Sequence, residues 1–137
     1  MSRFEVINPT SLGRPRGYNN GLLGPAGGRT LFVAGQIAWN EAQEIVSDEF
    51  AAQFERALAN VLAVVTEAGG SPAHLGRLTL YVVDRREYLA ALEGVGAAYR
   101  RLMGDHYPAM ALVEVAALLE PGAKVEIEGT AVLPAES

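Results

Sequence analysis

Two acidic residues near the C-terminus are the first candidates for chemistry. Glu126 and Glu128 are two residues apart, so in a β-strand they share one face while Val125 and Ile127 share the other. A carboxylate held in a cleft can position a water molecule or move a proton. From the spacing alone, a pair of carboxylates on a solvated edge strand is the alternative interpretation.

A glycine inside an apolar run is the second candidate. Gly35 interrupts the sequence F-V-A-G-Q-I at residues 32–37, which is otherwise typical of a strand. A glycine within a strand often marks a β-bulge or the close approach of another backbone. The segments 32–37, 108–115 and 125–129 are therefore the ones we keep as candidates for function.

The strong local motifs of nucleotide, metal and hydrolase sites are missing. The sequence has no G-x-x-x-x-G-K-[ST], G-x-G-x-x-G, H-E-x-x-H or G-x-S-x-G. It has no cysteine, and its two histidines, His74 and His106, lie in predicted loops where a solvated side chain is the expected role. We therefore predict no metal and no cofactor.

Length and charge limit the function classes. The 137 residues suit one domain, residues 1–137, with 11 basic and 16 acidic residues and a net charge of −5. This balance, with no basic run longer than two residues, opposes nucleic acid as a partner. No apolar leader is seen at the N-terminus and no apolar stretch could span a membrane, so we expect a cytoplasmic protein without a membrane partner.

Periodicity and end signals predict the elements. Strands are expected at 4–7, 18–23 (weak), 30–37, 78–83, 109–118 and 124–133, the last two joined by a turn at 120–122. A first helix is capped by Ser47, carries an apolar stripe from Phe50 to Val65 and ends at Gly69-Gly70. A second is capped by Asp84, with Glu87 completing a capping box, and runs to Leu102.

The order β-β-β-α-β-α-β-β predicts an α+β domain with a mixed, mostly antiparallel sheet and two helices on one face. Residues 31–34 and 78–83 are nevertheless apolar on both sides of their strands. The second face needs a cover that this chain does not contain, which predicts a symmetric homo-oligomer.

Taken together, these segments resemble the RidA/YjgF family of reactive-intermediate deaminases, whose older name is L-PSP endoribonuclease. The similarity lies in A-G-Q-I, A-L-x-N-V-L-A-V-V-x-E-A-G-G, L-T-L-Y-V-V-D, V-E-V-A and V-E-I-E-G-T-A-V, in that order, with Asn-Pro and R-G-Y near the start. It covers nearly the whole chain. The resemblance implies a chorismate-mutase-like fold, a homotrimer with three clefts between subunits, and hydrolysis of 2-imino acids without a cofactor.

The resemblance also assigns site residues. The family's cleft tyrosine matches Tyr18, its water-positioning glutamate matches Glu126, and the glycine before the strand glutamine matches Gly35. These three positions agree with the family pattern.

Four other positions depart from the family pattern. The arginine that holds the substrate carboxylate falls at Met110, and the usual cysteine is Leu112. The serine before the strand glycine is Ala34, and the asparagine of the second helix matches Gly96, which either allows close packing on the sheet or is simply a tolerated glycine. A thioether offers no hydrogen-bond donor, so activity on ordinary 2-imino acids is expected to be poor.

The leading hypothesis is a homotrimeric imine or enamine deaminase, or a related hydrolase, with an altered small-molecule substrate. Arg16 is a candidate replacement for the missing cation, and Trp39 for an apolar wall of the cleft, with core or interface packing as the alternative role of Trp39. A non-catalytic trimer that binds a metabolite or a partner is the second hypothesis, favoured by loss of the arginine. A ribonuclease is the third, opposed by the acidic charge.

Overall fold

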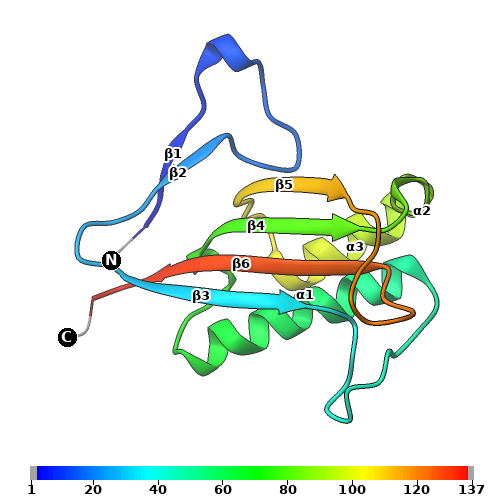
Figure 1. The fold of residues 1–137 in the computed structure, drawn as a ribbon. Helices are drawn as coiled ribbons and strands as arrows, with labels where there is room; N and C mark the ends of the chain where they lie inside the picture. The colour runs from blue at the N-terminus through cyan, green and yellow to red at the C-terminus, as the bar shows by residue number, and fades with distance from the viewer. Residues whose placement is uncertain (1–2, 136–137) are drawn as a thin grey trace.

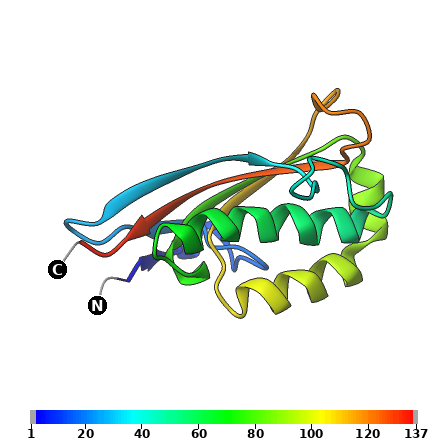
Figure 2. The same cartoon turned by 90° about the horizontal axis from the view of Figure 1, so that it is seen from below.

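The computed structural model describes residues 3–135, and it places two long helices against one face of a four-stranded sheet (Figures 1 and 2). The elements in chain order are β1 (Glu5–Ile7), η1 (Thr10–Leu12), β2 (Gly21–Leu23), β3 (Arg29–Gln36), α1 (Phe50–Glu67), η2 (Pro72–His74), β4 (Leu75–Val82), α2 (Arg85–Ala90), α3 (Leu92–Met103), β5 (Ala109–Glu114) and β6 (Val125–Leu133).

The main sheet has the strand order β3-β6-β4-β5. β6 pairs antiparallel with both of its neighbours, whereas β4 and β5 are parallel and are joined through α2 and α3. The predicted α+β architecture with a mixed, mostly antiparallel sheet is therefore confirmed. The first two strands form a separate two-stranded sheet, and Figure 1 shows residues 8–20, which we call the arm, projecting beyond the β5 edge.

The first helix forms because its apolar residues recur on one face. Phe54, Leu58 and Val61 are among the side chains that this face buries against the sheet. The helix begins at Phe50, so the predicted cap at Ser47 is wrong by two residues. The Ser47 hydroxyl instead accepts a 3.0 Å hydrogen bond from the backbone N–H of Glu49, which shapes the turn before the helix.

The second predicted helix is two helices, α2 and α3, with a break at Ala91. Asp84 caps α2 as predicted, since its carboxylate accepts a 2.9 Å hydrogen bond from the N–H of Arg86. The predicted capping box is wrong, because the Glu87 carboxylate accepts a 2.9 Å bond from the Nζ of Lys124 instead. This ion pair ties α2 to the segment that enters β6.

The strand predicted at 109–118 is too long, because β5 ends at Glu114. The N–H of Val115 still donates to the carbonyl of Val82, at 2.8 Å, and the chain then leaves the sheet. Leu119 is fully exposed in the loop that follows. Apolar β-forming residues alone do not continue a strand that has no ladder partner.

His106 is also placed differently from the expectation of a solvated loop residue. It is part-buried, its Nε2 lies 2.7 Å from the carbonyl oxygen of Leu75, and its ring stacks on Phe4 with 6.3 Å between centroids. His74 accepts a 2.9 Å bond from the N–H of Ser71 at the start of η2. Both histidines thus have structural contacts.

The sheet has one uncovered side, which we call the open face. Figure 2 shows both long helices on the same side of the sheet, so the part of the chain that the structure describes places no second layer on the other side. Phe32 of β3 is 80% exposed there, and Tyr81, Glu126 and Glu128 lie on the same face. No helix within residues 3–135 is long and apolar enough to cross a membrane.

Candidate functional site

Glu126 lies in the middle of the sheet, between two specific neighbours. Its strand, β6, is an interior strand, so the alternative of a solvated edge is wrong. Glu126 is paired with Tyr81 of β4 on one side, and its carboxylate lies over Gly35 of β3 on the other. A Cβ built on Gly35 would lie 2.8 Å from Cδ of Glu126, so only glycine leaves this carboxylate its place.

The strand around Gly35 has the irregularity that its sequence predicted. The pairing of β3 with β6 changes register between Val33 and Gln36, which is a β-bulge centred on Ala34 and Gly35. Ala34 is exposed beside Gly35, and its carbonyl accepts a 3.0 Å bond from Nε2 of Gln36. The bulge lets the backbone of β3 pass beneath the Glu126 carboxylate.

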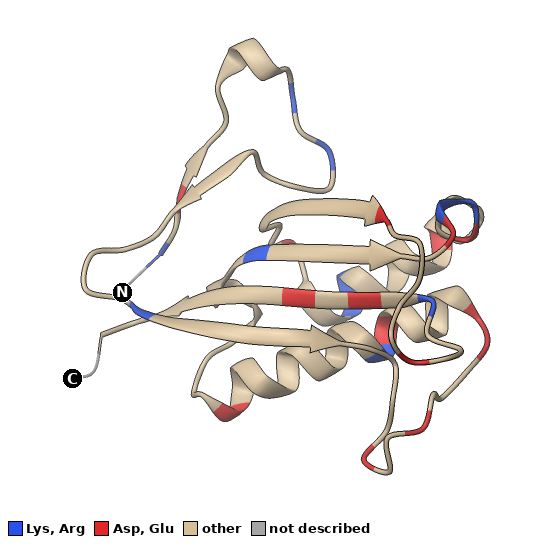
Figure 3. Ribbon diagram, in the orientation of Figure 1, with Lys and Arg blue, Asp and Glu red and all other residues tan. Residues whose placement is uncertain are grey.

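Negative charge is concentrated around Tyr81 on the open face. The pKa of the Tyr81 hydroxyl is raised by desolvation, by the charge of Glu128 and a hydrogen bond to it, and by the charge of Glu126. Figure 3 shows the two acidic positions close together along β6, at the middle of the sheet. A ligand or partner that contacts the middle of this face therefore lies close to carboxylates.

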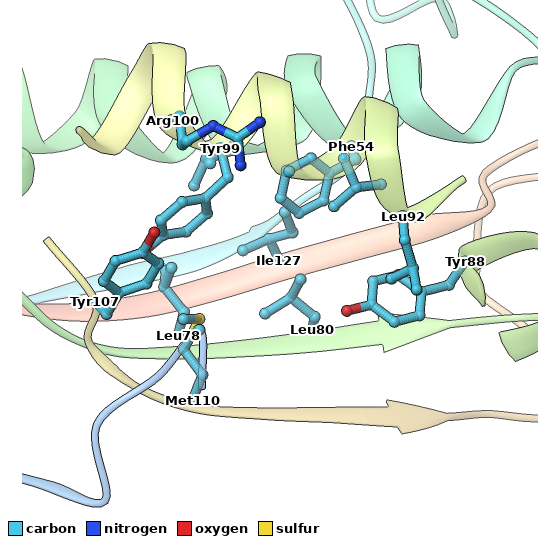
Figure 4. Close-up of a pocket in the computed structure, with 14 residues that line it drawn as sticks. Phe54, Leu78, Leu80, Tyr88, Leu92, Tyr99, Arg100, Tyr107, Met110 and Ile127 are labelled. Carbon is cyan, nitrogen blue, oxygen red and sulfur yellow. The ribbon is translucent and has the colours of Figure 1, made fainter. Parts of the chain in front are cut away.

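A cavity of about 260 Å³ lies on the opposite side, between α3 and the sheet; we call it the helix-side cavity (Figure 4). Met110 and Gly96, two of the predicted ligand contacts, both line it. Leu112 is part-buried against the core and is not among the lining residues. The complete lining is Gly17, Phe54, Leu58, Leu78, Leu80, Tyr88, Leu92, Val95, Gly96, Tyr99, Arg100, Tyr107, Met110 and Ile127.

Stacked tyrosines form one end of this cavity. The rings of Tyr99 and Tyr107 are nearly parallel, with 5.2 Å between centroids. The Tyr99 hydroxyl donates a 2.6 Å hydrogen bond to the carbonyl of His106, and burial, followed by the neighbouring Tyr107, raises its pKa. Tyr99 is thus neutral and fixed, so it provides an apolar, preformed wall.

Among the described residues, Arg100 is the one charged side chain in the lining of the helix-side cavity, and the sequence analysis did not identify it. Its Nη1 lies 3.2 Å from the position that a Cβ on Gly96 would take, so the guanidinium folds back over that glycine. Within residues 3–135 no carboxylate pairs with it. The signal was present in the sequence, because Gly96 and Arg100 are four residues apart and share a helix face.

Tyr18 lines a second cavity, of about 630 Å³, which we call the arm cavity and which Asn8 and Arg14 also line. Gly17 and Tyr107 line both cavities, so the two adjoin. Arg16 is exposed and lines neither of them.

Asn19 fixes the arm to the body of the protein. Its backbone N–H donates to the carbonyl of Pro108 at 3.1 Å, and its side chain donates to the carbonyl of Tyr107 at 2.6 Å. Tyr18 is therefore held beside the start of β5. The sheet edge formed by β5 is two strands away from β6 and Glu126.

The predicted site residues fall into two groups in one chain. Glu126, Gly35 and Ala34 lie on the open face, whereas Met110 and Gly96 lie on the helix side, with Tyr18 adjoining through the arm cavity. In a single chain, the predicted site residues thus form two groups that face in different directions.

Trp39 belongs to neither group. It lies in the loop after β3, where its carbonyl accepts a 3.0 Å bond from Asn60, and it lines neither cavity. Within residues 3–135, no three acidic, histidine or cysteine side chains are grouped as metal ligands.

Sequence comparison connects this arrangement to known proteins. The family described as Endoribonuclease L-PSP matches residues 14–133. The chain is 35% identical to the protein DfrA of Myxococcus xanthus over 106 residues, which cover 77% of each chain. It is 33% identical to the 2-iminobutanoate/2-iminopropanoate deaminase of Escherichia coli over 108 residues, covering 77% of this chain and 80% of that one.

Solved structures agree with the sequence comparison. A Yersinia pestis protein of the conserved Rid family superposes with a TM-score of 0.83 at 35% identity, covering 96% of this chain and 99% of that one. The YjgF gene product of Escherichia coli gives 0.65 at 32% identity, covering 91% and 92%. The expected chorismate-mutase-like fold is thereby confirmed, and the chain belongs to the RidA/YjgF family, also described as Endoribonuclease L-PSP.

Proposed function

We propose that this protein is a homotrimeric deaminase or related hydrolase that acts on a small imine or enamine in clefts between its subunits. The observation that carries the proposal is the division of the candidate site. Glu126 over Gly35 points away from the helices on the open face, while the ligand-sized cavities lie at the other side and edge of the same chain. A complete cleft requires a second copy.

The open face supports the trimer. An 80% exposed phenylalanine, Phe32, lies on a sheet face that no second layer from residues 3–135 covers. Closed, symmetric association is the usual way to cover such a face. In the assembly we propose, the open face of one subunit meets the β5 edge of the next, so that Glu126 faces the partner's Tyr18.

In this cleft Glu126 acts on water. It accepts a proton from the water molecule as the oxygen adds to the carbon of the C=N bond and returns it to the imine nitrogen, which gives a neutral carbinolamine. The proton of the new hydroxyl group then passes to the nitrogen through the same carboxylate, the C–N bond breaks, and a carbonyl compound and ammonia leave. One water is consumed for each ammonia released, and no electron transfer or cofactor is needed.

The substrate differs from that of the deaminases in the family because of Met110. A short 2-imino acid brings a carboxylate to this strand, where a thioether offers no donor. Leaving that anion unpaired in a partly desolvated cleft is costly. Met110 instead suits an apolar group, because its flexible thioether adapts to irregular shapes.

A non-catalytic trimer that binds a small metabolite is the second candidate. It is favoured by the apolar side chains at both Met110 and Leu112, which leave few polar groups on β5 to act on a substrate. RNA cleavage is disfavoured by the net charge of −5 and by the carboxylates on the open face. Purified protein should leave single-stranded RNA intact.

The test of the proposed function is ammonia release from imines that an amino-acid oxidase generates from a panel of amino acids. Glu126→Gln should lower the rate at least about a hundredfold, because general-base catalysis contributes roughly 10²–10⁴. Glu128→Gln is the matched control: it removes the same charge from the same face, two residues along the strand, and should retain most of the activity. Equal rates for Glu126→Gln and the unmodified protein would favour the binding function.

A further inference from the structure

Arg100 has the geometry of a ligand-binding residue. It lies on α3 at the side of the helix-side cavity, whereas Met110 lies on the strand side, with apolar and aromatic side chains between them (Figure 4). Arg100 is exposed, carries no ion pair within residues 3–135, and is the cavity's one charged lining residue. A guanidinium with free donors beside an apolar cavity suits an anion that has an apolar body.

Gly96 makes this position possible. Because it has no Cβ, the guanidinium of Arg100 can lie over the helix backbone, 3.2 Å from the place a Cβ would occupy. Within the same helix turn a larger side chain at 96 would push the guanidinium away from the cavity. Gly96 and Arg100 therefore act as a pair. This gives a specific role to the glycine, for which the sequence left both close packing on the sheet and simple tolerance open.

We propose that Arg100 binds the carboxylate of the substrate, whose apolar portion extends across the helix-side cavity toward Met110. This inference rests on the proposed function only in taking this cavity as the substrate site. It names the substrate class: an acid with an aromatic or branched aliphatic body, held with its charge at α3 and its apolar part at β5. The guanidinium that binds the carboxylate thus lies across the cavity from position 110.

Neighbouring arginines do not share this arrangement. Arg101 is the next residue on α3, but its guanidinium pairs with Glu55, with 2.8 Å between Nη2 and Oε1. Arg14 lines the arm cavity, and Arg16 lines neither cavity. Arg101 is therefore a matched control, because it has the same charge and is the next residue on the helix but does not line the cavity.

Two unreactive probes test the proposal by calorimetry: 3-phenylpropanoate and its neutral isostere 3-phenylpropanamide. The unmodified protein should bind the acid at least about tenfold more tightly than the amide, a difference of about 1.4 kcal/mol. Arg100→Gln should bring the two affinities close to equality, with Arg100→Lys between, because lysine keeps the charge but loses the planar fork. Arg101→Gln should keep the preference for the acid. Gly96→Leu retains Arg100 but should lose the preference for the acid, because the larger side chain displaces the guanidinium. Thermal unfolding checks that each variant is folded.

The outcomes separate this inference from the proposed function, because binding of an unreactive acid does not need Glu126. Loss of the acid preference in Arg100→Gln, alongside an inactive protein in the ammonia assay, supports the role of Arg100 and rejects the deaminase. Equal affinities for acid and amide in the unmodified protein overturn the inference. The inference is also overturned if the preference for the acid survives in Arg100→Gln, if Arg101→Gln loses this preference to the same extent, or if neither probe binds.

Discussion

The carboxylate of Glu126 lies so close over Gly35 that a single added methyl group would occupy its place. The two residues come from adjacent antiparallel strands, and the bulge in β3 sets their approach. Substitution of the glycine therefore tests the carboxylate's position without removing the carboxylate itself.

Gly35→Ala should lower the turnover number at least about tenfold, because a displaced general base loses part of a contribution of roughly 10²–10⁴. The rate of ammonia release measures this, with sedimentation to check the assembly. Gly24→Ala is the control, since a Cβ there would meet its nearest atom, Cγ2 of Val132, at an ordinary 3.7 Å. Full activity in Gly35→Ala would mean that the position of Glu126 is not important for the reaction.

Phe32→Asp should break the assembly into smaller species. The ring is 80% exposed in one chain, and a charge at its place would be buried against the neighbouring subunit. Sedimentation velocity should report three subunits for the unmodified protein and fewer for the variant. Leu89→Asp places the same charge on α2, where the side chain is 57% exposed, and should remain trimeric. A stable monomer of the unmodified protein at micromolar concentration would contradict the proposed cleft as well.

Met110→Arg should increase hydrolysis of short 2-imino acids by about tenfold or more, because each hydrogen bond to a charged group contributes about 1.5–3 kcal/mol. The unmodified protein should hydrolyse them poorly. Met110→Leu controls for the loss of the thioether and should show no gain. The expectation would be wrong if the unmodified protein hydrolysed these imines well and Arg16→Ala did not reduce the rate.

Gln53→Glu should destabilise the fold by at least about 2 kcal/mol, because it buries an ionisable carboxyl group and leaves at least one of two carbonyls without a donor. Gln53 is fully buried; its Nε2 donates to the carbonyls of Ser47 and Gly122 at 2.8 and 2.9 Å, and its Oε1 accepts from the N–H of Lys124 at 2.8 Å.

Urea unfolding at fixed protein concentration measures the effect of Gln53→Glu. Burial raises the pKa of a carboxyl group, so the new group stays protonated to a higher pH in the folded state than in the unfolded state. The deficit in stability should therefore grow as pH rises. Gln43→Glu makes the same change at an exposed turn and should stay within about 0.5 kcal/mol of the unmodified protein. A similar small effect at position 53 would contradict the buried network.

Regular periodicity made much of the fold predictable. The apolar stripe from Phe50 to Val65 gave α1, and the alternation from Val125 to Leu133 gave β6 almost to the residue. Predictions failed where tertiary contacts decide the outcome. β5 stops at Glu114 because no neighbour extends the ladder, and Glu87 binds Lys124 in preference to its own helix terminus.

The candidate site was predictable only in part, for a similar reason. The role of Gly35 could be read from its place inside a strand, because glycine there implies a close approach. Gln53 carries no such mark, since a glutamine on a helix is normally solvated. The one sign for Arg100 is the glycine four residues before it, which does not by itself show that a cavity lies beside that helix face. Their roles depend on which loop or cavity lies beside that helix face, and this is a property of the packed chain.

The asparagine contacts at the base of the arm have a consequence for how this protein can change. Asn8, Asn19 and Asn20 join its two ends, with Asn8 Nδ2 donating to Asn19 Oδ1 at 2.8 Å and the Asn20 N–H donating to Asn8 Oδ1 at 2.7 Å. The tip between them, including Gly13 at φ 74°, takes no part in the main sheet. Insertions or deletions at the tip can therefore reshape the arm cavity and leave the core intact. Descendants of such a sequence can acquire new ligands through this one segment, independently of the residues that fold the domain.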